Sequence, residues 1–445
     1  MREYFYSLLR RYISLFIFPQ NKVIEIDPMS CLLVGAIPQG KVAFRYSEAV
    51  KTSTIKFEND AVVPFDSIQE IRPDYIVIHG LIHYERDIQA LLADLHRMCH
   101  QDTRLLLVYY SSLWRPLMAL ASRVGLRDKL PEPNWLAHED IENLLKLERF
   151  ERVWLDHKVL IPFYLPLLSY VINRYFAPLP LFRNFCLVNI CVARPLPNEI
   201  FQALPNPSVS IIVPARNESE NIENILKRIP RMGPDDEIIF IEGHSTDNTW
   251  AAIQAAQARY GSRRRILAAQ QNGIGKGDAV FFGLSLARND ILMIFDADLT
   301  VSPEELPKFY DAIRTGKGEF INGSRLVYPM EAKAMRFFNL LGNKFFSVCF
   351  SFVLGQRLKD TLCGTKVISR SNYKKLSDNR NYFGSFDPFG DFQLIFGAVR
   401  MGLKIVEIPV FYRERVYGQT NIARWRHGFI LLFMLIFASL RLKFL

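Results

Sequence analysis

Two aspartates one residue apart end a strongly apolar stretch of the chain. Residues 291–300 read ILMIFDADLT, a pattern that predicts a buried strand ending in Asp296 and Asp298. Because side chains alternate along extended backbone, both carboxylates point the same way. Burying two like charges is costly unless a cation offsets them, and Mg²⁺ and Mn²⁺ prefer oxygen ligands and accept substrate phosphates. The pair therefore predicts a divalent ion that holds a diphosphate. Helix capping is the alternative role for such a pair.

Length and composition predict two domains and an anionic partner. The chain has 445 residues, of which 49% are hydrophobic, enough for two cores. The net charge is +10, and residues 401–445 hold seven Lys or Arg against two Glu, which suits an anionic surface. The six cysteines show no C-x-x-C spacing, as expected for reduced thiols in the cytoplasm. No nucleic acid partner is expected, and the oligomeric state stays open.

The C-terminal tail predicts a contact with a membrane surface. Residues 429–440, FILLFMLIFASL, would span about 18 Å as a helix, whereas the hydrocarbon core of a bilayer is about 30 Å thick. Four cations flank this segment: Arg424, Arg426, Arg441 and Lys443. We expect an amphipathic helix in the headgroup region of the inner face of the cytoplasmic membrane, or else a terminal helix packed on the protein's own core. The proline-containing residues 160–182 also predict an interfacial or docking segment.

A change of pattern near residue 200 predicts the domain boundary. Residues 195–207 are rich in proline and polar residues, which is typical of a linker. We therefore expect domains at 1–194 and 208–420, followed by a tail at 421–445. Four short apolar runs then alternate with helical patterns, which predicts a largely parallel sheet: 209–213, 237–241, 266–269 and 291–295. Ligands of such sheets gather at the carboxyl ends of the strands, where this chain has polar residues.

Four motifs then form a recognisable series. IIVPARNE (211–218), EGHSTDNT (242–249), NGIGKGDA (272–279) and FDADLT (295–300), in this order, resemble the family 2 glycosyltransferases of the GT-A fold. The branch they resemble contains dolichyl-phosphate mannose synthases and polyprenyl-phosphate sugar transferases, and the resemblance covers residues 208–445. It implies a metal-dependent, inverting transfer of a sugar from a nucleotide-sugar to a polyprenyl-phosphate or other lipid-linked acceptor at the membrane surface. Mg²⁺ or Mn²⁺ would be the cofactor.

The resemblance implies roles for individual residues. The nucleotide would be held by Pro214, Ala215, Glu218, Glu242, Asp247, Lys276 and Gly277, and the metal by Asp296 and Asp298. Arg415 would meet a phosphate in an R-x-x-G element completed by Gly418. Arg325 and residues 359–370 match further family blocks, without an assigned role. The chain departs from the family at Glu242, His244 and Asn421, where relatives carry an aspartate, a small residue and often a lysine.

Asp391 is the candidate catalytic group whose role depends on the acceptor. A sugar hydroxyl needs a general base, which typically contributes 10²–10⁴-fold to the rate. A phosphate monoester, with a second pKa of about 6, is already an anion at neutral pH. With a lipid phosphate as acceptor, Asp391 would only position the reacting groups.

The first domain resembles a class I S-adenosylmethionine methyltransferase over residues 22–194. The family's three loop glycines are replaced by Asp27, Met29 and Cys31, and Arg45 stands where the family has an acid for the ribose. Asp60 matches an adenine-side position. Side chains in the loop would obstruct the approach of the cofactor. We therefore expect an α/β protein with a Rossmann-like, degenerate first sheet and a GT-A second sheet, and S-adenosylmethionine is not an expected cofactor.

Three other functions compete with this interpretation. The chain could be a bifunctional glycosyltransferase and methyltransferase, or a membrane assembly module without catalysis. A processive polysaccharide synthase is disfavoured because four residues separate Gln419 from the pair Arg424–Trp425, unlike the QxxRW element of such enzymes. His96 and His100 share one face of a predicted helix, but without further ligands they indicate ordinary helix residues rather than a zinc site.

Overall fold

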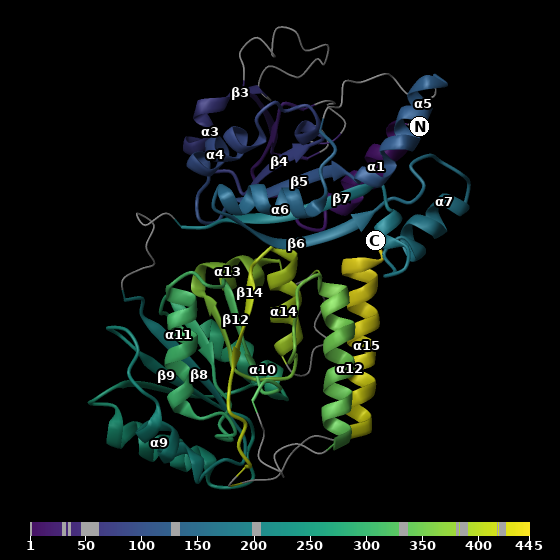
Figure 1. The fold of residues 1–445 in the computed structure, drawn as a ribbon. Coiled ribbons are helices and arrows are strands. Elements are labelled where there is room, and N and C mark those ends of the chain that lie inside the picture. Colours follow the sequence, from purple (N-terminus) through teal and green to yellow (C-terminus); the bar gives the residue numbers. More distant parts are fainter. Residues whose placement is uncertain are drawn as a thin grey trace. The chain divides into compact units, whose positions relative to one another are not determined.

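The computed structural model divides the chain into two units. It describes residues 2–28, 33, 37–45, 62–125, 134–197, 206–328, 337–379, 382, 390–415, 417 and 424–445. The first unit comprises Met1–Phe201 with Leu440–Leu445, and the second comprises Gln202–Ser439 (Figure 1). Met29, Cys31, Asp60, Gly418, Gln419 and Asn421 lie outside the described residues.

The first unit is built on a seven-stranded sheet with the order β3-β2-β1-β4-β5-β7-β6. Its strands are β1 (Val23–Ile26), β2 (Gly40–Phe44), β3 (Val62–Pro64), β4 (Tyr75–His79), β5 (Arg104–Tyr110), β6 (Phe150–Lys158) and β7 (Val188–Pro195). The first five strands are parallel, and β7 runs antiparallel to both β5 and β6. The chain order reverses between β1 and β4, which is the place where doubly wound sheets bind ligands.

The helices of the first unit close its core. They are α1 (Arg2–Ile13), α3 (Ile68–Ile71), α4 (Ile88–Met98), α5 (Arg115–Arg123), α6 (His138–Leu147) and α7 (Leu168–Val171). Leu91 and Leu95 of α4 and Ile141 of α6 are buried against the strand residues Ile78 and Leu107. In α4, His96 Nε2 lies 3.1 Å from the carbonyl oxygen of Leu196.

The end of the chain contributes a buried cation to the first unit. Lys443, within the helical segment Ser439–Lys443, is 3% exposed, and its Nζ lies 2.8 Å from Asp156 Oδ1. Lys158 Nζ lies 3.0 Å from Asp156 Oδ2 and donates to the carbonyl oxygen of Lys443. Burial alone would raise the pKa of Asp156, but the two lysines hold it well below its usual range. Lys443 therefore is not the lipid-facing anchor that the tail pattern predicts, because a buried carboxylate requires its charge.

The second unit contains a seven-stranded sheet with the order β10-β9-β8-β11-β13-β12-β14. Its strands are β8 (Val209–Ala215), β9 (Glu237–Glu242), β10 (Arg265–Gln270), β11 (Ile291–Ile294), β12 (Phe320–Ser324), β13 (Lys366–Ser369) and β14 (Ile405–Pro409). The parallel pairing of β10, β9, β8 and β11 agrees with the four apolar runs of the sequence, and β13 is antiparallel to its neighbours.

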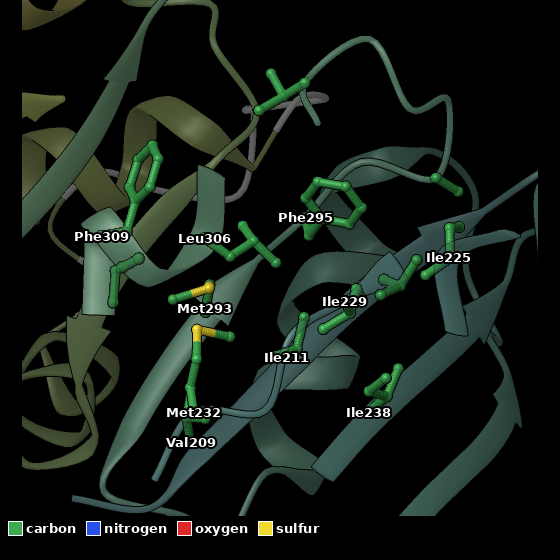
Figure 2. Close-up of a cluster of buried hydrophobic side chains, with 14 of the residues drawn as sticks. Val209, Ile211, Ile225, Ile229, Met232, Ile238, Met293, Phe295, Leu306 and Phe309 are labelled. Atoms are coloured by element: carbon green, nitrogen blue, oxygen red, sulfur yellow. The ribbon is translucent and has the colours of Figure 1, made fainter. Parts of the chain in front are cut away.

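Helices cover both faces of the second sheet. They are α8 (Asn221–Arg228), α9 (Thr249–Tyr260), α10 (Lys276–Leu286), α11 (Leu306–Arg314), α12 (Phe337–Leu354), α13 (Arg370–Asp378), α14 (Asp391–Arg400) and α15 (Arg424–Ala438). Figure 2 shows Ile225 of α8 and Phe309 of α11 in the core that also contains Ile211 and Met293 of the strands. On the opposite face, Gly283 of α10 lies against Ile212, where a Cβ would not fit. Burial on both faces explains the continuous apolar runs.

Helices α12 and α15 lie side by side in the second unit (Figure 1). Among the described helices, none combines the length and the hydropathy needed to cross a bilayer.

Candidate active site

The carboxyl ends of β8, β9 and β11 meet at one edge of the second sheet. Each of these ends is followed by a residue with a positive φ: Asn217 at 57°, His244 at 56° and Leu299 at 55°. Residues other than glycine rarely adopt this backbone region, and such strain is concentrated at functional sites. The three turns bring Glu218, Glu242 and the aspartates 296 and 298 to the same edge, as the sequence predicts.

Asp296 is held by a lysine and by a glycine. Lys276 Nζ, at the first position of α10, lies 2.7 Å from Asp296 Oδ1. A Cβ at Gly364 would overlap the carboxylate of Asp296, so the backbone can pass there only without a side chain. Burial alone would raise the pKa of Asp296, but Lys276, followed by Lys366 and Arg325, lowers it. The carboxylate is therefore ionised and closely surrounded by cations.

Asp298 is held by Thr300 on one oxygen and by Arg415 on the other. Thr300 donates from its backbone N at 3.1 Å and from its Oγ1 at 2.8 Å to Asp298 Oδ1. Arg415 Nη2 donates to Asp298 Oδ2 at 2.6 Å, and its Nη1 lies 3.4 Å from Glu218 Oε1. Arg415 thus bridges the end of β11 and the loop after β8, although it is 117 residues from Asp298 in sequence.

Glu218 and Asp247 join two loops of the expected nucleotide pocket. Glu218 accepts from Asn221 Nδ2 at 2.6 Å, while its backbone N donates to Thr249 Oγ1. Asp247 accepts from the backbone N of Thr249 at 2.9 Å and of Ser219 at 3.3 Å. Burial raises the pKa of Glu218 to about 7, against the opposing effect of Arg415. Pro214 and Ala215 complete the end of β8 beside them.

Glu242 has both carboxylate oxygens occupied by groups of this chain. The backbone N of Ser245 donates to Oε1 at 2.5 Å, and Gln270 Nε2 donates to Oε2 at 2.9 Å. These bonds outweigh burial and lower the pKa of Glu242. His244 Nε2 lies 3.0 Å from the carbonyl oxygen of Gly273. Both departures from the family pattern therefore have structural partners within the pocket loops.

Asp391 lies between two lysines at the start of α14. Lys366 Nζ is 3.2 Å from Asp391 Oδ1, and Lys276 Nζ is 4.0 Å from Asp391 Oδ2. Burial alone would lower the pKa of Lys276, but Asp296 and Asp391 raise it above its ordinary value. Gly390 has φ +74°, and a Cβ there would come within 2.9 Å of the Gly277 Cα. The two glycines let α14 approach α10 closely, which brings Asp391 to Lys276.

The carboxylates at this edge could bind a divalent ion only if the ion replaced a basic side chain that is now paired with one of them. The side chains of Asp296 and Asp298 are 32% and 16% exposed, and both are ion-paired with cations of the protein. Among the described residues, no group of three or more His, Cys, Asp or Glu side chains is arranged to hold a metal. The ammonium of Lys276 and the guanidinium of Arg415 supply the positive charge that an ion would supply. Mg²⁺ or Mn²⁺ would have to displace at least one of them.

A family comparison covers part of the second unit. Residues 210–377 match the model of Glycosyl transferase family 2. This region is similar to family 2 glycosyltransferases, and we call it the glycosyltransferase domain. The prediction of a glycosyltransferase is thereby confirmed at the level of the domain.

Relatives with described functions match about half of the chain. A dolichol-phosphate mannosyltransferase of Pyrococcus furiosus is 28% identical over 220 residues, which cover 48% of this chain and 59% of that protein. A polyprenol monophosphomannose synthase of Mycolicibacterium smegmatis is 25% identical over 225 residues, covering 49% of this chain and 82% of the synthase. About half of this chain thus has a counterpart in these relatives, and the chain spans 59% of the length of the first.

A solved structure is also similar to part of the chain. Glucosyl-3-phosphoglycerate synthase of Mycobacterium tuberculosis, in complex with Mn²⁺, uridine diphosphate and glucosyl-3-phosphoglycerate, gives a TM-score of 0.38 at 20% identity. The match covers 53% of this chain and 80% of the synthase.

Sequence reasoning missed several residues that shape the site. Lys366 and Gly364 lie in the block 359–370, which matched the family without an assigned role. The guanidinium of Arg325 is engaged within the protein, because it donates hydrogen bonds of 2.7 and 2.8 Å to Asp360. The sequence signal for Gly364 is its position in TLCGTK, just before a strand, where a glycine often marks a close backbone approach.

Proposed function

We propose that this protein is a metal-dependent, inverting glycosyltransferase that moves a sugar from a nucleotide-sugar to a polyprenyl phosphate or another lipid-linked acceptor at a membrane surface. The observation that carries the proposal is the cluster of Asp296, Asp298, Lys276 and Arg415 at the ends of parallel strands of a family 2 glycosyltransferase domain. Relatives named for transfer to dolichol phosphate and polyprenol phosphate support the acceptor class.

The nucleotide would lie along the loops after β8 and β9. Pro214, Ala215, Glu218, Glu242 and Asp247 would line the base and ribose pocket. The start of α10 supports binding of the diphosphate, because this helix of 11 residues begins with Lys276 and Gly277 and points its free amides outward. Glu218 ionises near neutrality, so its ability to accept from a ribose hydroxyl changes across the physiological range.

The cation cluster suits the charge that develops during transfer. As the bond between the sugar and the diphosphate breaks, negative charge grows on the leaving group, and positive groups aimed at it lower the barrier. A divalent ion on Asp296 and Asp298 would neutralise part of this charge. Once the ion pairs of the aspartates are exchanged, Lys276 and Arg415 are available to contact phosphate oxygens.

Asp391 and Lys366 would serve the acceptor side. A phosphate acceptor arrives as an anion and needs no base, since its second pKa is about 6. Lys366 and Lys276 flank Asp391, so that the carboxylate holds two ammonium groups at the place where an anionic acceptor would be guided. We assign Asp391 a positioning role for a lipid phosphate, and a role as general base for a hydroxyl acceptor.

The pair α12 and α15 supports a lipid-facing surface. Neither helix contains an acidic residue, while Lys344, Arg424 and Arg426 supply cations. Among its described side chains, the pair exposes seven large apolar ones: Leu341, Phe345, Val348, Phe429, Leu432, Phe433 and Ile436. Such a surface partitions into the headgroup region of anionic bilayers. We propose a peripheral location on the inner face of the cytoplasmic membrane.

The first unit would be a methyltransferase-like scaffold without its cofactor. The strand order around β1 and β4 supports the resemblance, and Asp27, at the first expected glycine, has φ 43°. Arg45 is engaged by Asp94 at 2.5 Å and Glu85 at 3.4 Å, which leaves a cation where a ribose would require an acceptor. Calorimetry with S-adenosylmethionine tests this: heat of binding would favour the bifunctional alternative.

Release of nucleoside diphosphate from a panel of nucleotide-sugars tests the donor half of the proposal. We expect release with Mg²⁺ or Mn²⁺, loss of release with a chelator, and a loss of about 100-fold or more in Asp298→Asn, as for removal of one stabilising group. Asp311→Asn is the matched control, because Asp311 is an exposed aspartate that pairs with Arg314 on α11. No release from any donor would support the non-catalytic assembly module instead.

A further inference from the structure

Helix α5 of the first unit presents an apolar stripe that no part of its core covers. The helix has no buried side chain. Together with the residues that flank it, it exposes Leu113, Leu117, Leu120 and Val124, each between 54% and 60%. The spacing of four, three and four residues places these side chains on one face of the helix. An apolar stripe usually faces a core, so an outward stripe indicates an external partner.

Residues 163–185 of the same unit expose a second set of large apolar side chains. This set comprises Phe163, Tyr164, Leu167, Leu168, Tyr170, Tyr175, Phe176, Leu181 and Phe185. Leu167 and Leu181 are the most exposed, at 77% and 74%. Leu167 also has φ 58°, a backbone region that leucine rarely adopts. The backbone of this segment therefore keeps the Leu167 side chain exposed in an unfavourable conformation. An isolated leucine on a surface would not require that conformation.

A hydrogen bond links the start of α5 to the end of the second segment. Trp114 Nε1, at the start of α5, donates to the carbonyl oxygen of Phe185 at 2.8 Å. The segment is anchored beneath by Asn173, which is 1% exposed and accepts from the backbone N of Leu160 and of Ile161. We call the exposed residues of 113–124 and 163–185 the α5 surface. The hydrogen bonds of Trp114 and Asn173 hold its backbone in place, whereas its exposed side chains do not pack on a core.

The charges of the α5 surface are of one sign. Residues 111–125 and 159–187 contain four arginines and no aspartate or glutamate. Arg174 lies over the rings of Tyr170 and Tyr175, each at 5.5 Å. Apolar and aromatic side chains combined with arginines, without acids, match the interface of an anionic bilayer, where rings sit at the headgroups and cations meet phosphate. A protein partner of mixed charge would find no acidic group here to pair with its own basic residues.

We propose that the α5 surface docks the first unit onto an anionic lipid bilayer. The proposal does not rest on sugar transfer, and it gives the methyltransferase-like unit a function of its own as a membrane-docking module. A chain with one lipid contact in each unit would have two membrane signals, and two weak signals give stable attachment where one gives reversible binding.

Vesicle binding by the full-length protein tests this docking. Phe345→Glu with Phe433→Glu first weakens the surface of α12 and α15, so that binding through the first unit can be measured. We expect this parent to bind vesicles of phosphatidylcholine with phosphatidylglycerol better than vesicles of phosphatidylcholine alone. Adding Leu117→Glu and Leu120→Glu should lower binding to the anionic vesicles by about tenfold or more, since two leucines lose their apolar environment. Arg115→Gln with Arg123→Gln should remove the preference for anionic lipid.

Leu147→Glu is the matched control for these variants. Leu147 of α6 is 55% exposed, as Leu120 is, but it lies beside Glu148 in a helix that also carries Glu139. This control should bind vesicles as the parent does. The docking is refuted if Leu117→Glu with Leu120→Glu binds anionic vesicles like the control. It is also refuted if those substitutions only convert a dimer to a monomer, since a second copy of the chain would then cover the surface. Release of nucleoside diphosphate, measured without lipid, reports separately on the proposed transferase.

Discussion

At Gly364 the chain passes directly against the carboxylate of Asp296, and this contact fixes where the carboxylate can lie. Two neighbouring aspartates are visible in the sequence, because an apolar strand that ends in acids is an unusual pattern. Their partners are not visible in the same way. Arg415 reaches Asp298 across 117 residues, and only the fold determines that it does. The candidate site could thus be predicted as a set of acids, but not as a set of ion pairs.

Gly364→Ala should impair catalysis without unfolding the domain. The new methyl group would displace Asp296 from Lys276, and a misplacement of about 1 Å can cost about 100-fold in rate. The measurement is nucleoside diphosphate release, with circular dichroism to show that the fold is kept. Gly428→Ala is the matched control, because a Cβ there meets no atom within 4 Å. Equal rates for the two variants would contradict the assigned position of Asp296.

His79 should make the first unit sensitive to acid. Its side chain is 2% exposed, neither ring nitrogen has a hydrogen-bond partner among the described residues, and burial lowers its pKa from 6.5 to about 4. Between these values the unfolded chain binds a proton that the native unit does not, so stability falls as the pH falls. We expect a loss on the order of 3 kcal/mol from about pH 6.5 to 4.

The pH dependence of unfolding by denaturant is the measurement for His79. The variant His79→Leu cannot take up the proton, so its stability should change less over the same range. The difference in slope between the two proteins isolates this histidine from the carboxylates, which titrate in both. Parallel slopes would show that His79 is solvated or partnered in solution.

The elements of the glycosyltransferase domain follow closely from the sequence. The runs 209–213, 237–241, 266–269 and 291–295 correspond to β8, β9, β10 and β11, because strands buried on both faces are continuously apolar. The outward face of α5 could not be predicted, since a helical apolar pattern does not reveal whether a core lies beside it. The close approach of α14 to α10 depends on Gly390 and Gly277, which are distant in sequence.

Gly390→Ala should separate these two helices. Alanine in the left-handed backbone conformation would be destabilising by about 1–2 kcal/mol, and its Cβ would also lie only 2.9 Å from the Gly277 Cα. We expect Asp391 to move from Lys276 and the transfer of sugar to acceptor to fall by about tenfold or more. Gly125→Ala is the control, because Gly125 has φ +73° and a Cβ there would meet no atom within 4 Å. This variant therefore has the backbone strain without a steric contact. Transfer assays and thermal unfolding of both variants distinguish the two effects. Equal losses of transfer in the two would argue against a role for the helix contact.

At the scale of the whole molecule, the end of the chain belongs to the first unit. The tail pattern predicts cations at a membrane, and for Lys443 this prediction is wrong, because Asp156 lies 287 residues away and sequence spacing carries no sign of it. Residues 440–445 therefore tie the chain back into the first unit, while α15 remains within the second.

Lys443→Met should destabilise the first unit. Removing one partner of a buried ion pair typically costs about 3–5 kcal/mol, and Lys158 compensates only part of this loss. The unfolding transition of the first unit should shift, while that of the glycosyltransferase domain should not. Arg441→Met, an exposed neighbour, serves as the control. If Lys443→Met unfolds like the control, the buried triad does not form in solution.

Transfer of labelled sugar into lipid tests the central claim most directly. Membranes containing polyprenyl phosphate are incubated with the protein and each labelled nucleotide-sugar, with and without Mg²⁺ or Mn²⁺, and then extracted with organic solvent. The account predicts label in the lipid fraction that requires the ion and is lost in Asp298→Asn but not in Asp311→Asn. Label that appears equally in Asp298→Asn, or without any divalent ion, would contradict it.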